Sequence, residues 1–189
     1  MHILAINGSP RKGGNTDMIL DKILAGASAN GASCTKIMLN DLKISPCQEC
    51  EKQNKNGECG VSDDMQMVFD KIGKADVVVL GSPIFFGSLS AQTKCMIDRF
   101  QCLWKAKYIY GTVDKSFTKK GVFAAVSASL RQDFFDNAKM ITKNFFATIG
   151  AKYSHEIFCA GPSEKGDVLQ YTECMEKAFE LGKEIAATF

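Results

Sequence analysis

The chain has 189 residues, of which 46% are hydrophobic and 23% are charged, and its formal net charge is +2. This composition predicts one globular domain over residues 1–189, and the lack of a basic run excludes a typical nucleic-acid-binding surface. No apolar stretch approaches the length needed to span a membrane, and the first residues predict a strand rather than a signal peptide. We therefore expect a cytoplasmic protein with no nucleic-acid partner and no membrane partner.

The elements predicted from hydrophobic periodicity alternate between strand and helix. Strands are predicted at about residues 2–7, 33–39, 76–81, 121–126 and 152–158, and helices at about residues 16–29, 63–74, 90–104, 133–149 and 165–188. Residues 108–118 lack a clear period and are predicted to form a loop, and residues 41–62 predict a polar loop insertion that contains cysteines. This alternation predicts an α/β fold, a doubly wound five-stranded parallel sheet with helices on both faces.

The first predicted strand is followed by Gly-Ser-Pro-Arg-Lys-Gly-Gly-Asn-Thr, residues 8–16, and then by a helix. Glycines let backbone amides turn toward one point, and a helix N-terminus offers unpaired donors with partial positive charge. The segment lacks the ATP-binding and dinucleotide-binding loop motifs. It predicts another kind of phosphate site, or else a polar turn that only caps the helix. The candidate phosphate ligands are Ser9, Arg11, Lys12, Gly14, Asn15 and Thr16.

The third predicted strand is a β-branched run typical of a strand that is buried on both faces. It ends in Gly-Ser-Pro-Ile-Phe-Phe-Gly, residues 81–87. Such a loop offers a flat apolar wall, together with backbone donors and acceptors, to a planar ring. The candidate ring contacts are Pro83, Ile84, Phe85, Phe86 and Gly87.

These two segments, with the downstream residues Lys94, Asp98 and Arg99, resemble the motifs of flavodoxin-like NAD(P)H-dependent FMN reductases and iron-sulfur flavoproteins. The resemblance implies a strand order of 2-1-3-4-5, in which both segments leave neighbouring strands at the switch point of the sheet. It implies that the first segment binds the phosphate of FMN and that the second contacts the isoalloxazine ring.

The segment after the fourth predicted strand, residues 127–132, should reach the same crevice. The resemblance implies that it lines the pyrimidine end of the flavin, although the glycines usual in that family are absent. Ser127 and Ser129 are candidate donors there. Arg131 is a candidate for stabilising negative charge on reduced flavin, or else a solvated loop arginine.

The function implied is an FMN-dependent oxidoreductase that takes electrons from NAD(P)H and passes them to a quinone, flavin, azo or nitro compound, or metal. The flavin carries the chemistry, so we expect no catalytic side chain. An FMN electron-transfer protein without direct NAD(P)H turnover is the alternative, and a domain that has lost FMN is a weaker one.

The resemblance also implies a homodimer or higher homo-oligomer. Lys94, Asp98 and Arg99 are expected as an ion-pair set in which Asp98 pairs with a basic residue.

Eight cysteines are present. Cys47, Cys50 and Cys59 resemble three ligands of the iron-sulfur loop, but Gln53 stands where the remaining loop ligand belongs. A fourth ligand for a [4Fe–4S] cluster would have to come from Cys102 or from another subunit. A loop without metal, a zinc site and a redox disulfide are the alternatives. Four other cysteines have apolar neighbours and are expected to act as small hydrophobic residues, namely Cys34, Cys95, Cys159 and Cys174.

Overall fold

A parallel sheet organises the protein in the computed structural model, which describes residues 1–50 and 55–187. The parallel strands are β1 (His2–Asn7), β2 (Ser33–Met38), β3 (Val77–Phe85), β5 (Lys119–Ser127) and β6 (Ala151–Ala160). Their order is β2-β1-β3-β5-β6, and every neighbouring pair is parallel. The predicted fold class and the predicted order 2-1-3-4-5 are therefore confirmed, with one short additional strand, β4 (Ser88–Leu89), inserted between the third and fourth parallel strands.

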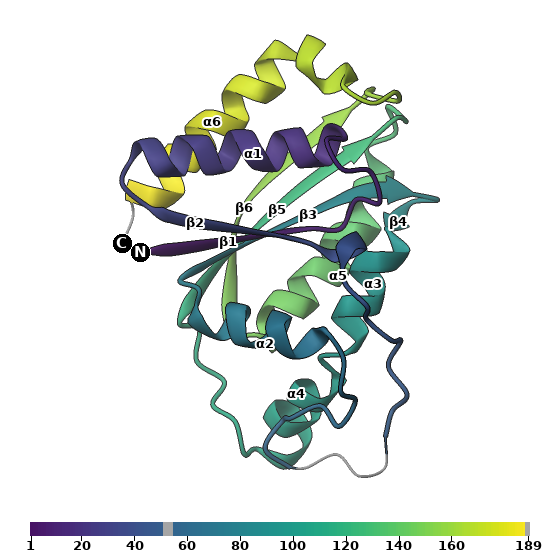
Figure 1. The fold of residues 1–189 in the computed structure, drawn as a ribbon, viewed down its shortest axis with the longest axis vertical. Helices are drawn as coiled ribbons and strands as arrows, with labels where there is room; N and C mark the ends of the chain where they lie inside the picture. Colours follow the sequence, from purple (N-terminus) through teal and green to yellow (C-terminus); the bar gives the residue numbers. More distant parts are fainter. Residues whose placement is uncertain (51–54, 188–189) are drawn as a thin grey trace.

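The helices cover the two faces of this sheet (Figure 1). One face carries α1 (Asn15–Ala29) and α6 (Thr172–Ala187), and the other carries α2 (Met65–Lys74), α3 (Ala91–Asp98) and α5 (Asp133–Thr148). Each face has its own hydrophobic cluster: Ile3 and Ala5 of β1 belong to one, and Leu4 and Ile6 to the other. Consecutive apolar residues of β1 therefore pack into two separate hydrophobic clusters, one on each face of the sheet. Within the described residues, no helix combines the length and apolar character needed to cross a membrane.

Helices α1 and α6 approach each other closely because each presents a glycine at the crossing. A Cβ atom added to Gly26 would lie 2.0 Å from the carbonyl oxygen of Phe179, and one added to Gly182 would lie 2.0 Å from that of Ile23. Any side chain at either position would therefore push the helices apart.

Two predicted helices differ from the observed ones. The helix predicted at 90–104 divides into α3 and α4 (Gln101–Lys105), which are separated at Arg99 and Phe100, and a π-helical turn (Ala106–Tyr110) extends α4 into the predicted 108–118 loop. The helix predicted from residue 165 begins only at Thr172, after a short 3-10 helix (Asp167–Gln170). The Asp167 carboxylate accepts hydrogen bonds from the amides of Ser163 and Glu164, which stabilises a loop where periodicity predicted a helix.

Strand β3 is longer than predicted and continues into a hairpin. It extends to Phe85 and pairs antiparallel with β4, with Ile84 opposite Leu89 and Phe85 opposite Ser88. The two-residue turn between them places Phe86 at φ +50° and Gly87 at φ +69°. Such turns favour Asn-Gly because both central residues have positive φ. A phenylalanine that is fully exposed on its own subunit carries backbone strain in this conformation and gains no burial within that subunit.

Phe86→Asn is expected to raise the free energy of unfolding by about 1 kcal/mol, because asparagine adopts positive φ more readily than phenylalanine does. Thermal denaturation should show a Tm increase of about 2–4 °C for a domain of this size. Phe85→Asn is the matched control: Phe85 lies in the extended strand, so this change should give no increase. A Tm for Phe86→Asn equal to or below that of the parent would contradict the assignment of strain to this turn.

Candidate functional site

The carboxyl ends of β3 and β5 and the segments that follow β1, β5 and β6 meet around one cavity of about 140 Å³. The predicted first loop lies beside the end of β3, where the sequence predicts a loop, because β1 and β3 are neighbours in the sheet. The cavity is lined by Ser9, Arg11, Asn15, Thr16, Pro83, Ile84, Phe85, Val126, Ala128, Pro162 and Ser163. The structure thus brings seven of the predicted residues together: Ser9, Arg11, Asn15, Thr16, Pro83, Ile84 and Phe85.

The other predicted residues lie outside this lining. Lys12 is exposed, and Gly14 is buried just before α1. Phe86 and Gly87 form the exposed turn of the hairpin. The remaining predicted residues are Ser127, Ser129 and Arg131 of the third segment.

The first loop is fixed against β3 and the start of α3. The amide of Gly8 donates to the carbonyl of Gly81 at 2.8 Å, and the hydroxyl of Ser90 donates to the carbonyl of Gly8 at 2.6 Å. A Cβ atom at Gly8 would lie 1.7 Å from the Thr93 hydroxyl oxygen, so only glycine allows this approach. The loop therefore enters α1 along a defined path.

The start of α1 presents unsatisfied donors to the cavity. In the part of the chain that the structure describes, the amides of Asn15, Thr16 and Asp17 have no hydrogen-bond acceptor. The Thr16 side chain is buried, with a residue exposure of 2%, and its hydroxyl also lacks a partner among the described residues. Free amides at a helix N-terminus bind anions, and a buried hydroxyl without a partner is costly unless a ligand satisfies it. This donor set fits a phosphate group.

A buried carboxylate holds this helix start in place. Asp17 accepts hydrogen bonds from the Asn7 amide at 2.9 Å, the Gly13 backbone amide at 2.8 Å and the Lys36 ammonium at 2.6 Å. Burial alone would raise the pKa of Asp17, but Lys36, Gly13 and Asn7 together hold that pKa below its usual value. The carboxylate joins β1, the first loop, α1 and β2, and Lys36 compensates its negative charge next to the candidate phosphate position.

Asn15 has a role that its sequence position did not predict. Its side-chain amide donates to the carbonyl of Glu164 at 2.8 Å, and its side-chain oxygen accepts from the amides of Gly166 and Val168 at 2.9 and 3.3 Å. The Asn15 side chain thus ties α1 to the segment after β6. That segment supplies Pro162 and Ser163 to the cavity, and no sequence motif in the connection between the last predicted strand and helix indicated them.

Two hydrogen bonds from backbone amides to serine hydroxyls hold the third segment. Ser127 accepts from the amide of Ser129 at 3.1 Å, and Ser129 accepts from the amide of Arg131 at 3.2 Å. Only Ala128 and the preceding Val126 reach the cavity lining. The Arg131 guanidinium is exposed, pairs with Asp133 and lies 4.4 Å from the centroid of the Phe134 ring.

Comparison with known proteins identifies the family. Residues 1–162 match the sequence model of NADPH-dependent FMN reductases. The chain belongs to this family. An iron-sulfur flavoprotein of Methanocaldococcus jannaschii is 36% identical over 99 residues, which cover 52% of this chain and 51% of the relative. One from Archaeoglobus fulgidus is 29% identical over 189 residues, which cover 100% of this chain and 80% of the relative. For the first of these relatives, and for several others, the match spans about half of the relative's length.

Solved structures of similar fold include an NAD(P)H:quinone oxidoreductase from Methanothermobacter marburgensis. It has a TM-score of 0.70 and 18% identity, with 98% of this chain and 96% of that chain covered. An FMN-dependent NADH-azoreductase from Bacillus anthracis, in complex with FMN, has a TM-score of 0.68 and 12% identity, with 98% and 100% covered. At these identities the likeness establishes the flavodoxin-like fold.

The cysteine segment of this FMN reductase family member has one cysteine fewer than the iron-sulfur pattern that it resembles. Cys47, Cys50, Cys59 and Cys102 line one enclosed hollow of about 10 Å³. Among the described residues, no group of three potential ligands has the geometry to hold a metal ion, and Gln53 lies outside the described residues. The described residues thus place four cysteine side chains around one hollow without forming a three-ligand group for a single metal ion.

Arg99 is buried against the cysteine segment. Its guanidinium is 1% exposed and donates to the sulfur of Cys59 at 3.2 Å, the Asp63 carboxylate at 2.6 Å and the carbonyls of Ser45 and Val61 at 2.9 and 3.1 Å. Arg99 therefore pins both ends of the cysteine segment. The predicted pairing of Asp98 is confirmed with Lys94 at 2.6 Å, whereas Arg99 pairs with Asp63 instead.

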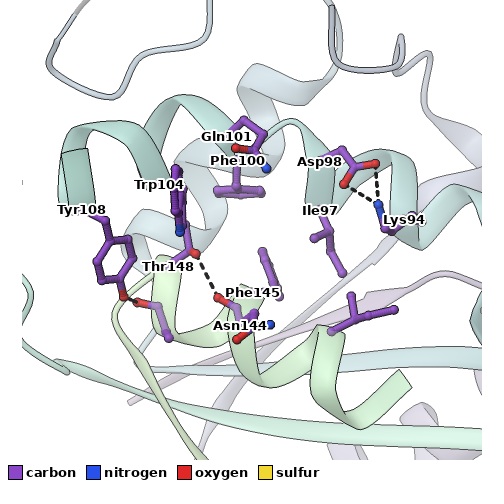
Figure 2. A pocket seen from close by; sticks show the side chains of 12 residues that line it. Lys94, Ile97, Asp98, Phe100, Gln101, Trp104, Tyr108, Asn144, Phe145 and Thr148 are labelled. Carbon is purple, nitrogen blue, oxygen red and sulfur yellow. Dashed lines mark hydrogen bonds and ion pairs between the residues drawn. The ribbon is translucent and has the colours of Figure 1, made fainter. Parts of the chain in front are cut away.

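A larger hollow lies away from the family's candidate cofactor site. It has a volume of about 440 Å³ and lies between α3, α4 and α5, with Trp104, Tyr108 and Phe145 among its lining residues (Figure 2). The Lys94–Asp98 ion pair lies at one end, and the Tyr108 hydroxyl donates to the carbonyl of Ala147 at 3.3 Å. None of the predicted cofactor residues lines it, so size alone does not identify the site.

Asp17→Asn is expected to lower the free energy of unfolding by about 2 kcal/mol at pH 7, because Lys36 and Gly13 lose a charged acceptor. The folded-state pKa of Asp17 is lowered, so its contribution is complete above the unfolded-state pKa of about 3.9 and disappears as the pH falls through the folded value. Denaturant unfolding from pH 2 to 7 should show the parent and variant converging in acid.

Asp21→Asn is the matched control, because exposed Asp21 also pairs with Lys36 but accepts no hydrogen bond from the loop. This change should cost less than about 0.5 kcal/mol at any pH. Equal losses for the two variants would contradict the role assigned to Asp17.

Proposed function

We propose that the protein is an FMN-dependent oxidoreductase that takes electrons from NAD(P)H and passes them to a small acceptor such as a quinone, flavin, azo or nitro compound, or metal ion. The observation that carries the proposal is the buried, unpartnered Thr16 hydroxyl beside three free helix amides, facing the apolar end of β3 across one cavity. Family membership supports it, and so do the activities named for the two fold neighbours.

In this proposal the amides of Asn15 to Asp17 and the Thr16 hydroxyl hold the phosphate of FMN, and exposed Arg11 contributes positive charge. Ile84 and Phe85 provide an apolar wall for the ring, and the segments at Ala128 and Pro162 close the site around it. FMN, when bound, supplies the redox chemistry between nicotinamide and acceptor.

A homodimer is the assembly that we propose for this function. The fully exposed Phe86 and half-exposed Phe85 at the hairpin beside the cavity support it, because an exposed aromatic pair next to a ligand site is typical of a surface that a second subunit covers.

Thr16→Val should weaken FMN binding roughly 10- to 100-fold, because it removes one hydrogen bond to a charged group and preserves the side-chain shape. Riboflavin, which lacks the phosphate, should bind parent and variant equally. Fluorescence titration of both flavins measures the two constants. Thr142→Val is the control, since that buried hydroxyl donates to the carbonyl of Ala138 within α5. Equal FMN affinity for parent and Thr16→Val would refute the phosphate assignment.

The activity is tested by anaerobic absorbance spectra of the FMN-loaded protein before and after NADPH or NADH is added. Loss of the flavin bands with either nucleotide, followed by their return with a quinone, is the expected result. If the flavin bands persist with both nucleotides, the protein does not oxidise NAD(P)H directly, and an FMN electron-transfer function would take the place of the proposed one. A protein that takes up no FMN would overturn the cofactor assignment itself.

A further inference from the structure

A pair of cysteines lies outside both the candidate FMN site and the cysteine segment, where β6 ends and α6 begins. Cys159 is buried in β6, and Cys174 is partly exposed in the first turn of α6. The two thiols line the same groove and lie close enough to shift the pKa of each other. Their apolar sequence neighbours predict that both are core residues, but their proximity allows the two thiols to react with each other.

An open groove gives solvent access to this pair. The groove has a volume of about 360 Å³, and both cysteines line it together with Tyr171, Glu173 and Lys177. Cys159 is only 3% exposed. A small reagent that enters the groove therefore meets Cys174 first and Cys159 behind it.

The surroundings distinguish the two thiols. Cys174 is the third residue of α6, where unpaired amides and the helix dipole favour a negative charge. The neighbouring Cys159 thiol lowers the pKa of Cys174, and the charge of Lys177 adds to this effect, whereas burial and Glu173 oppose it. The neighbouring Cys174, together with burial, raises the pKa of Cys159. One sulfur is thus favoured as the thiolate while its neighbour stays protonated.

We propose that Cys174 and Cys159 form an oxidisable dithiol site, in which Cys174 is the thiol that attacks a hydroperoxide and Cys159 is the thiol that resolves the product. With hydrogen peroxide, the Cys174 thiolate forms an S–O bond as the O–O bond breaks, and the departing hydroxide takes up a proton to become water. The Cys159 sulfur then forms an S–S bond as that S–O bond breaks, and its proton leaves with the hydroxyl group as a second water. Two thiols are oxidised and one peroxide is reduced.

The disulfide would act on the segment between its two ends. Residues 160–173 include Pro162 and Ser163 of the cavity lining and the backbone groups that Asn15 contacts. Oxidation would therefore clamp the segment that borders the candidate FMN site. The dithiol chemistry itself does not depend on FMN binding, so it can fail or succeed independently of the proposed function.

Peptide mapping of the full-length protein tests the proposal directly. Trypsin should release residues 153–165 and 166–177, and these contain Cys159 and Cys174 as their only cysteines. After treatment of reduced protein with hydrogen peroxide, mass spectrometry should find these two peptides joined by a disulfide that dithiothreitol cleaves. Absence of this pair, or preferential joining of either peptide to another cysteine, would overturn the proposal.

Two further measurements separate the roles of the thiols. At pH 7, iodoacetamide should label Cys174 on the order of tenfold faster than Cys34, a partly exposed cysteine that lies in a strand. In Cys159→Ser, peroxide should leave a sulfenic acid on Cys174 that dimedone traps, whereas Cys34→Ser should form the disulfide as the parent does. Equal labelling rates, or no dimedone adduct on Cys174, would contradict the assignment of Cys174 as the attacking thiol.

Discussion

The candidate site depends on the buried carboxylate of Asp17. A phosphate-binding helix start needs its amides free, yet the loop that leads into it must be rigid. Asp17 meets both needs, since it binds the Gly13 amide from within the first turn and leaves the amides of Asn15 to Asp17 unpaired. Its charge would oppose a phosphate, and Lys36 from β2 compensates that charge at 2.6 Å. The edge strand β2 thus takes part in the site without touching the cavity.

The site is assembled by contacts between segments that are far apart in sequence. Asn15 binds backbone groups about 150 residues away, as its hydrogen bonds to Glu164 and Gly166 show. Ser90 and Thr93 pack against Gly8, so the start of α3 supports the first loop. A change in the segment after β6 is therefore expected to reach the phosphate position through Asn15. The dithiol proposed at Cys159 and Cys174 lies at the two ends of that same segment.

Arg99 shows how a family motif can carry a different role from the one its spacing indicates. A guanidinium buried beside Cys59 and Asp63 needs all of its partners, and it finds them in the cysteine segment rather than in Asp98. The segment that holds clustered metal ligands in the iron-sulfur pattern is here anchored by an arginine.

The sequence by itself indicated the parallel sheet, the loop after β1 and seven of the residues that line the cavity, and the family resemblance supplied the strand order. Hydrophobic period and the glycine-rich turn are local properties, and neighbouring strands bring their carboxyl ends together by topology. Only the tertiary structure decided that Asn15 binds the segment after β6 and that Pro162 and Ser163 line the cavity. It also decided that Phe86 adopts a positive φ in the hairpin turn and that Arg131 pairs with Asp133. Each of these depends on a partner or a backbone angle that no local pattern encodes, because side-chain hydrogen bonds are assigned only when the chain has folded.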